Sequence, residues 1–284
     1  MAGNRTWFIT GAGRGIGNAL TTAALAAGER VFATVRRPDA IHQLQDVYST
    51  SLHVEVLDVR ERVAVQAVVG RAFEHFGRVD VIVNNAGYGL VGTIEEVGED
   101  DARAIMDTNF LGALWVTQAA LPLLRGQGSG HIVQISTVGA VGTMPTLGLY
   151  NASKWALEAF SEPLAGEVAR FGIRVTIAEL GGFDTDWGRS SMQFATPVPA
   201  YDSLREELFG TATVPWEPSE PDEDTREARP ELAAEAIREH VAREDGPLRL
   251  LVGADAPGMV AMALAMRRDD YVKNSHFSWP PIED

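Results

Sequence analysis

The sequence predicts an α/β protein with a doubly wound parallel sheet of about seven strands, covered by helices on both faces. Short apolar runs of strand character alternate with longer helical patterns along the 284 residues. This order is typical of parallel strands joined by crossover helices. A glycine-rich turn directly follows the first apolar run, and 45% of the residues are hydrophobic, which is enough for the core of one domain spanning residues 1–284.

The first unit is a strand, a glycine-rich turn and a helix. The strand is Thr6 to Thr10, and the helical stretch that follows the turn is rich in Ala and Leu. Glycines let a pyrophosphate approach the amino terminus of a helix, where free N–H groups favour an anion. The context predicts a Rossmann-type dinucleotide site; a glycine loop without a ligand is the alternative. The residues of the turn are Gly11-Ala12-Gly13-Arg14-Gly15-Ile16-Gly17.

The residues after the second strand bear on the choice of coenzyme. Arg30 to Val35 is the expected strand, and Arg36 and Arg37 follow it with no acidic residue before Asp39. An acid at this place binds the ribose hydroxyl of NAD, whereas an arginine suits the 2′-phosphate of NADP. The sequence therefore favours NADP(H) over NAD(H), with Arg14 as a further positive contact. Solvated loop charges are the alternative.

Further strands are expected to end in polar or small residues. Leu52 to Leu57 ends at Asp58-Val59, where a carboxylate either meets an adenine amino group or caps the helix expected over Arg62 to Phe76. Val79 to Val83 leads into Asn84-Asn85-Ala86-Gly87, whose small residues permit close approach of a cofactor and whose amides tie neighbouring loops together. A long helical pattern over Asp101 to Leu124 contains Asn109.

The second half of the chain continues the alternation. The expected strands are His131 to Ile135, ending at Ser136-Thr137, and Ile173 to Leu180, ending at Gly181-Gly182-Phe183-Asp184-Thr185. Because the carboxyl ends of parallel strands share one edge of a sheet, one crevice there collects all these residues. Between the two strands lies a helix that contains Tyr150 and Lys154 and continues to about Arg170.

Tyr150 and Lys154 lie one turn apart on the same face of this helix. A neighbouring ammonium favours the phenolate and lowers the pKa of a tyrosine, which lets it exchange a proton during a reaction. By itself the pair favours the alternative, a half-buried tyrosine beside a solvated lysine. The residues around it favour the catalytic interpretation.

Residues 183–229 change in character and predict a lid over the substrate. Prolines, aromatic residues and an acidic run from Glu217 to Glu227 alternate there; a surface excursion without a role is the alternative. After it we expect a helix over Glu231 to Arg243, a strand over Leu248 to Val252, and a carboxyl-terminal extension over 257–284 that begins with a helix from Pro257 to Met266. The expected apolar substrate wall is Met144, Leu147, Trp187, Met192 and Phe194.

Composition argues against several classes of protein. The formal charge of −15 opposes binding to nucleic acid and to anionic membranes. The chain has no cysteine, and its six histidines are not spaced as metal ligands, so no metal site is expected. No apolar run is long enough to span a bilayer. A cytoplasmic protein is the expectation.

Together these residues resemble the short-chain dehydrogenase/reductase family. The matching features are Thr10-Gly11-x-x-x-Gly15-Ile16-Gly17, the Asn-Asn-Ala-Gly turn, Asn109, the hydroxyls after the fifth strand, and Tyr150-x-x-x-Lys154. Residues 150–158 and the Gly-Gly-Phe-x-Thr-Asp-Trp after the sixth strand look like a bacterial subgroup. The resemblance covers roughly the first 190 residues.

The resemblance implies an NAD(P)-dependent oxidoreductase that acts on a carbonyl compound or secondary alcohol, assembled as a homodimer or homotetramer. The expected substrate is medium-sized and largely apolar. Tyr150 would act as the general acid or base, Lys154 would lower its pKa and hold the nicotinamide ribose, and Asn109 would position a water. The implied cofactor-binding residues are Gly11, Gly13, Arg14, Gly15, Ile16, Gly17, Arg36, Arg37, Asp58, Val59, Asn85, Ala86, Gly87, Tyr150, Lys154, Gly181, Gly182, Phe183 and Thr185.

Two positions depart from the family pattern. The family's serine stands thirteen residues before the tyrosine, a position that Thr137 occupies here, while Ser136 is one residue earlier. Only one of the two is expected to face the site, because successive residues of a strand point to opposite faces, and the spacing favours Thr137. The family's proline after the sixth strand is replaced by Leu180. These departures leave open a non-redox enzyme, such as a dehydratase, cyclase or isomerase, and a dinucleotide-sensing protein as alternatives.

Overall fold

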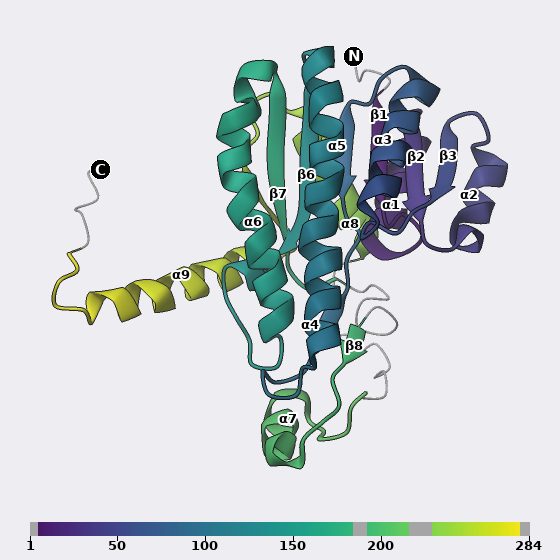
Figure 1. Ribbon diagram of the computed structural model, residues 1–284. Helices are drawn as coiled ribbons and strands as arrows, with labels where there is room; N and C mark the ends of the chain where they lie inside the picture. The colour runs from purple at the N-terminus through teal and green to yellow at the C-terminus, as the bar shows by residue number, and fades with distance from the viewer. Residues whose placement is uncertain (1–4, 184–191, 216–228, 279–284) are drawn as a thin grey trace.

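A seven-stranded parallel sheet forms the centre of the molecule (Figure 1). The structure is a computed structural model that describes residues 5–183, 192–215 and 229–278. From one edge of the sheet to the other, the strands are β3 (Leu52–Val56), β2 (Arg30–Val35), β1 (Thr6–Thr10), β4 (Val81–Asn84), β6 (Gly130–Thr137), β7 (Ile173–Leu180) and β9 (Arg249–Val252).

The order of the strands reverses between β1 and β4. The chain runs outward from β1 through β2 to β3, crosses back to β4 beside β1, and then runs outward the other way. In doubly wound sheets a ligand crevice forms at such a switch point, outside the carboxyl ends of the strands. The predicted fold class is confirmed, and the topology places that crevice beside the glycine-rich turn.

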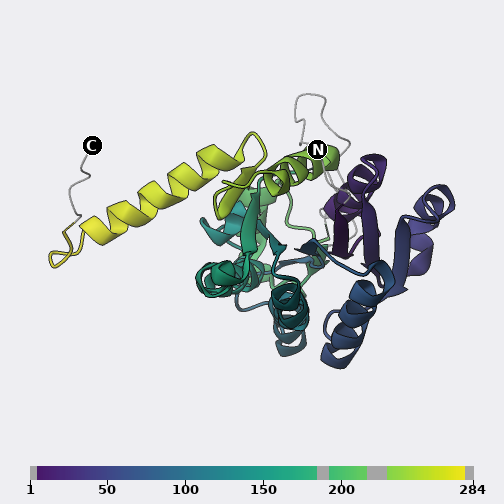
Figure 2. The ribbon, with the colours of Figure 1, turned by 90° about the horizontal axis from the view of Figure 1, so that it is seen from above.

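Helices cover both faces of the sheet (Figure 2). One face packs against α1 (Gly15–Ala26) and α8 (Pro230–Ala242), and the other against α3 (Arg62–Phe76), α5 (Gly112–Gln127) and α6 (Gly148–Val168). Short helical segments are η1 (Pro38–Ile41), α2 (His42–Val47), η3 (Val138–Ala140), η4 (Ala169–Phe171) and η5 (Pro199–Tyr201).

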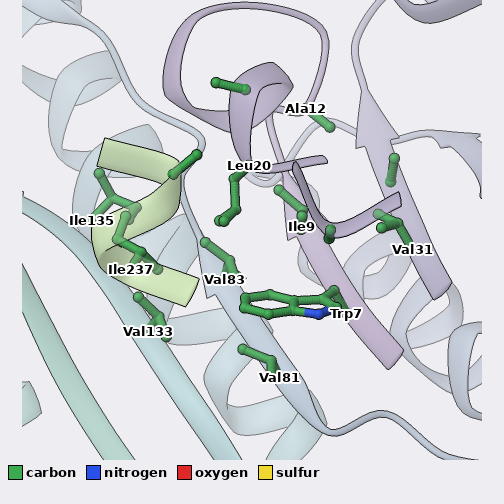
Figure 3. Packing of buried hydrophobic residues seen from close by; sticks show 14 of the residues in the cluster. Trp7, Ile9, Ala12, Leu20, Val31, Val81, Val83, Val133, Ile135 and Ile237 are labelled. Carbon is green, nitrogen blue, oxygen red and sulfur yellow. The ribbon is translucent and has the colours of Figure 1, made fainter. Parts of the chain in front are cut away.

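Alternation along β1 divides the core between the two faces. Trp7 and Ile9 belong to the α1/α8 side, where Leu20 and Ile237 close over them (Figure 3), and Phe8 belongs to the opposite side. All of these side chains are fully buried or nearly so. Because both faces are covered, β1 is apolar at successive positions, which is typical of a central parallel strand.

The long helical pattern predicted over Asp101 to Leu124 is divided in the structure. It consists of α4 (Glu99–Met106), one π-helical turn η2 (Asp107–Leu111) and α5. The π turn contains Asn109, whose side chain is buried. Such turns inside α-helices are frequent at functional sites, and the hydrophobic pattern alone does not reveal them.

Other boundaries differ from the prediction. The fourth strand begins at Val81 instead of Val79 and includes Asn84. The last helix, α9 (Ala256–Val272), extends beyond the predicted end at Met266, and Arg267 and Arg268, which follow it, are good helix formers.

The segment after β7 is attached to the body through a small second sheet. β8 (Met192–Phe194) pairs in parallel with β5 (Gly89–Val91), and neither three-residue strand was predicted. A helix, α7 (Asp202–Phe209), follows. Its Arg205 is 3% exposed and donates to the Glu96 carboxylate and to the carbonyl oxygens of Val198 and Ala212. A buried pair of this kind is strongly destabilising to break, so Arg205 fixes the described part of the predicted lid.

Candidate active site

A cavity of about 850 Å³ opens at the carboxyl ends of the central strands. It gathers most of the predicted cofactor and catalytic residues from the ends of the central strands and from α1 and α6. On its lining are Gly11, Gly13, Arg14, Gly15, Ile16, Arg36, Arg37, Asp58, Val59, Asn85, Ala86, Gly87, Ser136, Thr137, Tyr150, Lys154, Gly181, Gly182 and Phe183. Gly17 and Asn109 are not on the lining but lie directly behind residues that are. Thr185 lies outside the described residues.

The glycine turn and the loop after β4 are locked together. The Asn85 side-chain amide donates to the carbonyl oxygens of Thr10 and Gly11, at 2.9 and 3.1 Å. In return the Thr10 hydroxyl accepts from the backbone N–H groups of Asn85 and Ala86. A Cβ atom on Gly17 would lie 2.4 Å from Asn85 Nδ2 and 2.5 Å from the Gly11 oxygen, so only glycine fits there.

The amino terminus of α1 faces the cavity as an anion site. Gly15 and Ile16, the first residues of α1, line the cavity. Among the described residues, no side chain caps the helix and no acidic residue stands in its first turn. The first N–H groups and the positive end of the helix dipole therefore fit a phosphate or pyrophosphate group.

The far end of the cavity is rich in arginine. Arg36 and Arg37 follow β2 and line the cavity on its exposed side. Arg60, which the sequence analysis did not select, lines it too and holds both carboxylate oxygens of Asp58. Hydrogen bonds from Arg60 lower the pKa of Asp58. The Asp58 carboxylate is therefore already paired with Arg60, and its expected contact with an adenine amino group stays a prediction.

Tyr150 lies at the opposite end of the cavity, near the start of α6. It is 8% exposed, and burial raises its pKa to about 12. A hydrogen bond between the side chains of Thr137 and Tyr150 acts in the other direction. The phenol is therefore protonated at neutral pH. Thr137 supplies the hydroxyl that is hydrogen-bonded to it.

The two hydroxyls at the end of β6 point to different partners, as strand alternation requires. Ser136 donates its hydroxyl to a carboxylate oxygen of Glu158, farther along α6 from Tyr150. Thr137 faces Tyr150 and also accepts from the Gly139 N–H at 3.2 Å. Thr137 is therefore the hydroxyl beside Tyr150, and its role in holding a substrate oxygen stays a prediction.

Lys154 lies one turn beyond Tyr150 and is buried. Its Nζ donates to the Ile135 carbonyl oxygen at 2.8 Å and lies 3.6 Å from where a Cβ atom on Gly87 would stand. Burial lowers the pKa of Lys154 to about 8, and the negative charge of Glu158 opposes this shift. Its protonation is thus sensitive to pH just above neutrality.

Asn109 joins the loop after β4 to α6. Its side-chain oxygen accepts from the Tyr88 N–H, and its amide nitrogen donates to the Tyr88 carbonyl and to the Ser153 hydroxyl. A Cβ atom on Gly87 would lie 3.0 Å from Asn109 Oδ1. The Asn109 side chain therefore holds the loop after β4 against α6. Its expected role in positioning a water stays a prediction.

The loop after β7 is held by an acid that the sequence analysis missed. Gly181 N–H donates to the Val252 carbonyl, and Gly182 N–H donates to Asp255 Oδ2 at 2.9 Å. A Cβ atom on Gly181 would lie 2.1 Å from Asp255 Oδ1. Asp255 thus helps to fix a loop in which Leu180 replaces the family's proline.

The predicted substrate wall is brought together only in part. Leu147 packs beside Tyr150 in a cluster with Tyr88, Leu90 and Ile105. In the described part of the chain, the lining of the cavity does not include Leu147, Met144, Met192 or Phe194. Trp187 and the acidic run from Glu217 to Glu227 lie outside the described residues.

Two further findings concern metals and membranes. Within residues 5–183, 192–215 and 229–278, no cluster of His, Asp and Glu side chains is arranged to hold a metal ion. None of the helices in those same ranges is long and apolar enough to cross a membrane.

Comparison with known proteins gives the family. The model of the short chain dehydrogenase family matches residues 5–195. The chain is 39% identical over 261 residues to the oxidoreductase BOA17 of Botryotinia fuckeliana, covering 89% of this chain and 90% of the relative.

Solved structures agree in fold. A short-chain dehydrogenase from Streptomyces avermitilis superposes with a TM-score of 0.83 at 36% identity, covering 95% of this chain and 96% of that one. A Burkholderia phymatum member in complex with NAD has a TM-score of 0.79 at 20% identity, over 98% of both chains. A Burkholderia cenocepacia member in complex with NADP has a TM-score of 0.73 at 22% identity, over 95% of this chain and 97% of that one. This chain belongs to the short-chain dehydrogenase family and is an NAD(P)-dependent oxidoreductase.

Proposed function

We propose that the protein is an NADP(H)-dependent reductase or dehydrogenase that acts on a largely apolar ketone, aldehyde or secondary alcohol. The observation that carries this proposal is that one cavity combines a site suited to a coenzyme phosphate with a group of side chains suited to proton transfer. An uncapped helix terminus with arginines fits a phosphorylated dinucleotide at one end, and Tyr150, Thr137 and Lys154 meet at the other. We extend the proposal to a cytoplasmic, homo-oligomeric enzyme without nucleic-acid or membrane partners.

The coenzyme preference rests on charge. A 2′-phosphate at the end of β2 would meet Arg36 and Arg37, and an arginine matches a phosphate through paired N–H donors. Asp58 does not compete for them, because Arg60 already holds both of its oxygens. A ribose hydroxyl, by contrast, would find no free acid among the residues on the described lining at that end.

The chemistry divides between the coenzyme and the protein. Bound NADPH supplies the hydride. Tyr150 donates a proton to the carbonyl oxygen, and its high pKa keeps the phenol protonated beforehand. Thr137 holds the same oxygen, and the charge of Lys154 stabilises the phenolate that remains. In alcohol oxidation the same groups act in reverse.

The non-redox enzyme and the dinucleotide sensor remain the alternatives. A sensor has no use for a buried tyrosine and lysine beside the cavity, where burial disfavours the charged form of each. A non-redox enzyme on this scaffold would form product without any change in the nicotinamide. The buried pair supports the redox function over both.

We predict that Arg36→Ala weakens binding of NADPH and leaves binding of NADH unchanged. A charge-assisted contact of about 1.5 kcal/mol, the low end expected for a charged hydrogen bond because Arg36 is exposed, corresponds to roughly tenfold in affinity. Fluorescence titration with both coenzymes measures the effect. The control is Arg103→Ala, which removes an exposed arginine paired with Glu99 on α4. Equal loss for NADH, or no loss for either, contradicts the assignment to NADP(H).

We predict that Thr137→Val lowers kcat by about tenfold or more, because the isosteric change removes only the hydroxyl beside Tyr150. Binding of NADPH, followed by fluorescence, stays near that of the wild type. Ser136→Ala is the matched control, and most activity survives in it because its hydroxyl serves Glu158. Loss of activity in Ser136→Ala alone reverses the assignment.

We predict that carbonyl reduction declines as the pH rises through about 8, the pKa of Lys154. Tyr150, with its pKa near 12, stays protonated over this range and does not limit the acid step. Glu158→Gln removes the charge that raises the pKa of Lys154, so the alkaline limb of the kcat/KM profile moves to lower pH. Glu162→Gln is the control, since Glu162 also contacts Arg249 but is half exposed. A limb that stays in place in Glu158→Gln refutes this coupling.

A further inference from the structure

The direction of the Thr137 hydroxyl depends on the loop that follows it. Thr137 is the last residue of β6 and caps η3, where its hydroxyl oxygen accepts from the Gly139 N–H at 3.2 Å. A hydroxyl has a single hydrogen to donate. Because the Gly139 N–H occupies one side of the oxygen, the hydrogen is left for Tyr150 or for a substrate oxygen. The position of Gly139 therefore decides where the Thr137 hydroxyl points.

Trp155 holds Gly139 from the other side. It directly follows Lys154 on α6, and its Nε1 donates to the Gly139 carbonyl oxygen at 3.1 Å. The loop is also packed closely on α6, since a Cβ atom on Gly139 would lie 2.8 Å from Asn151 Oδ1, one turn before Trp155. Gly139 is thus fixed through both its N–H and its carbonyl group.

Helix α9 supplies a second support for the same loop. Figures 1 and 2 show α9 projecting from the body of the molecule, and a Cβ atom on Gly142 would lie 3.0 Å from the Ala263 Cβ of this helix. Farther along α9, Arg267 donates to the Val141 carbonyl oxygen at 2.6 Å. Its guanidinium also lies 4.6 Å from the centre of the Trp155 ring, a distance at which a cation is attracted to the face of an indole. Arg267 therefore holds the loop directly and also holds the indole that supports it.

We propose that Trp155 and Arg267 are positioning residues, which hold the loop after β6 in the place that directs the Thr137 hydroxyl toward Tyr150. In the described ranges neither side chain lines the cavity, so both act from outside it. The proposal rests on the proposed function, in which Thr137 holds the substrate oxygen. It gives a role in the reaction to α9, which lies beyond the residues matched by the family model.

Amide hydrogen exchange tests the support of the loop without any measurement of activity. Mass spectrometry follows peptides that cover residues 138–142. The N–H groups of Val141 and Gly142 donate to the Val138 carbonyl, and that of Gly139 donates to Thr137, so these amides are protected while the loop is closed.

Two variants remove one support each. Trp155→Phe removes the N–H that Gly139 accepts, and Arg267→Met removes the cation and its N–H donors. Each is expected to raise exchange of the loop by about threefold or more, because local opening becomes easier. Arg267→Lys keeps a cation over the indole and is expected to fall between the wild type and Arg267→Met. Lys273→Ala is the control, since it removes an exposed charge that pairs with Asp270 on the same helix.

Steady-state kinetics tests the consequence for the reaction. With NADPH and either acetophenone or octanal, kcat is expected to fall by about threefold in Trp155→Phe and in Arg267→Met, and to recover in part in Arg267→Lys. The dissociation constant of NADPH, measured by fluorescence, is expected to stay unchanged. A general loss of structure would weaken coenzyme binding as well, and circular dichroism checks that each variant is folded.

The outcomes separate this proposal from the proposed function. Unchanged exchange in both Trp155→Phe and Arg267→Met overturns it. Raised exchange with unchanged kcat also overturns it, provided that Thr137→Val is impaired. A wild type that oxidises no NADPH with a carbonyl compound, or a Thr137→Val variant with full kcat, refutes the proposed function instead. In that case the exchange data still decide whether the two residues hold the loop.

Discussion

The close approach of the loops after β1 and β4 is the constraint on which the site depends. Two adjacent parallel strands end there, and Asn85 and Thr10 bond each loop to the other. Gly17 fits between them only because it has no side chain. With this junction fixed, α1 starts at a defined point, and its free N–H groups face the cavity. The same junction leads to Gly87, and Asn109 Oδ1 and Lys154 Nζ both lie close to that glycine.

The reacting end of the cavity is governed by burial of two ionisable groups. Desolvation favours the neutral form of both groups: it raises the pKa of Tyr150 and lowers the pKa of Lys154. Thr137 favours the phenolate and Glu158 favours the ammonium. Glu158 in turn is held by Arg249. Three residues thus lie in one row along α6: Tyr150, Lys154 and Glu158. This row connects the catalytic end of the cavity to the ion pair between Glu158 and Arg249.

Most of the fold follows from pattern, and part of the site does not. The strands at Thr6 to Thr10 and Ile173 to Leu180 were predicted with their observed ends, because apolar runs bounded by glycine are unambiguous. The three-residue strands β5 and β8 are too short to show alternation, and their pairing depends on residues far apart in sequence. The π turn around Asn109 has no hydrophobic signature of its own.

Among the site residues, the ordered motifs predicted which backbone segments line the cavity. The glycine turn and Tyr150 line the cavity as expected. Arg60 and Asp255 were missed because each acts by holding a neighbour, Asp58 or the loop at Gly182, and such contacts need coordinates. The expected substrate wall depended on how a long segment folds back, which local sequence does not specify.

The most direct test of the proposed function is to follow the hydride itself. Reduction of a panel of apolar ketones and aldehydes with NADPH deuterated at the transferable position, read by mass spectrometry, reports whether deuterium reaches the carbonyl carbon. The account predicts labelled alcohol from the wild type and none from Tyr150→Phe, a variant that still binds NADPH. Product that forms without deuterium and without oxidation of the nicotinamide would contradict the redox function and favour the non-redox alternative.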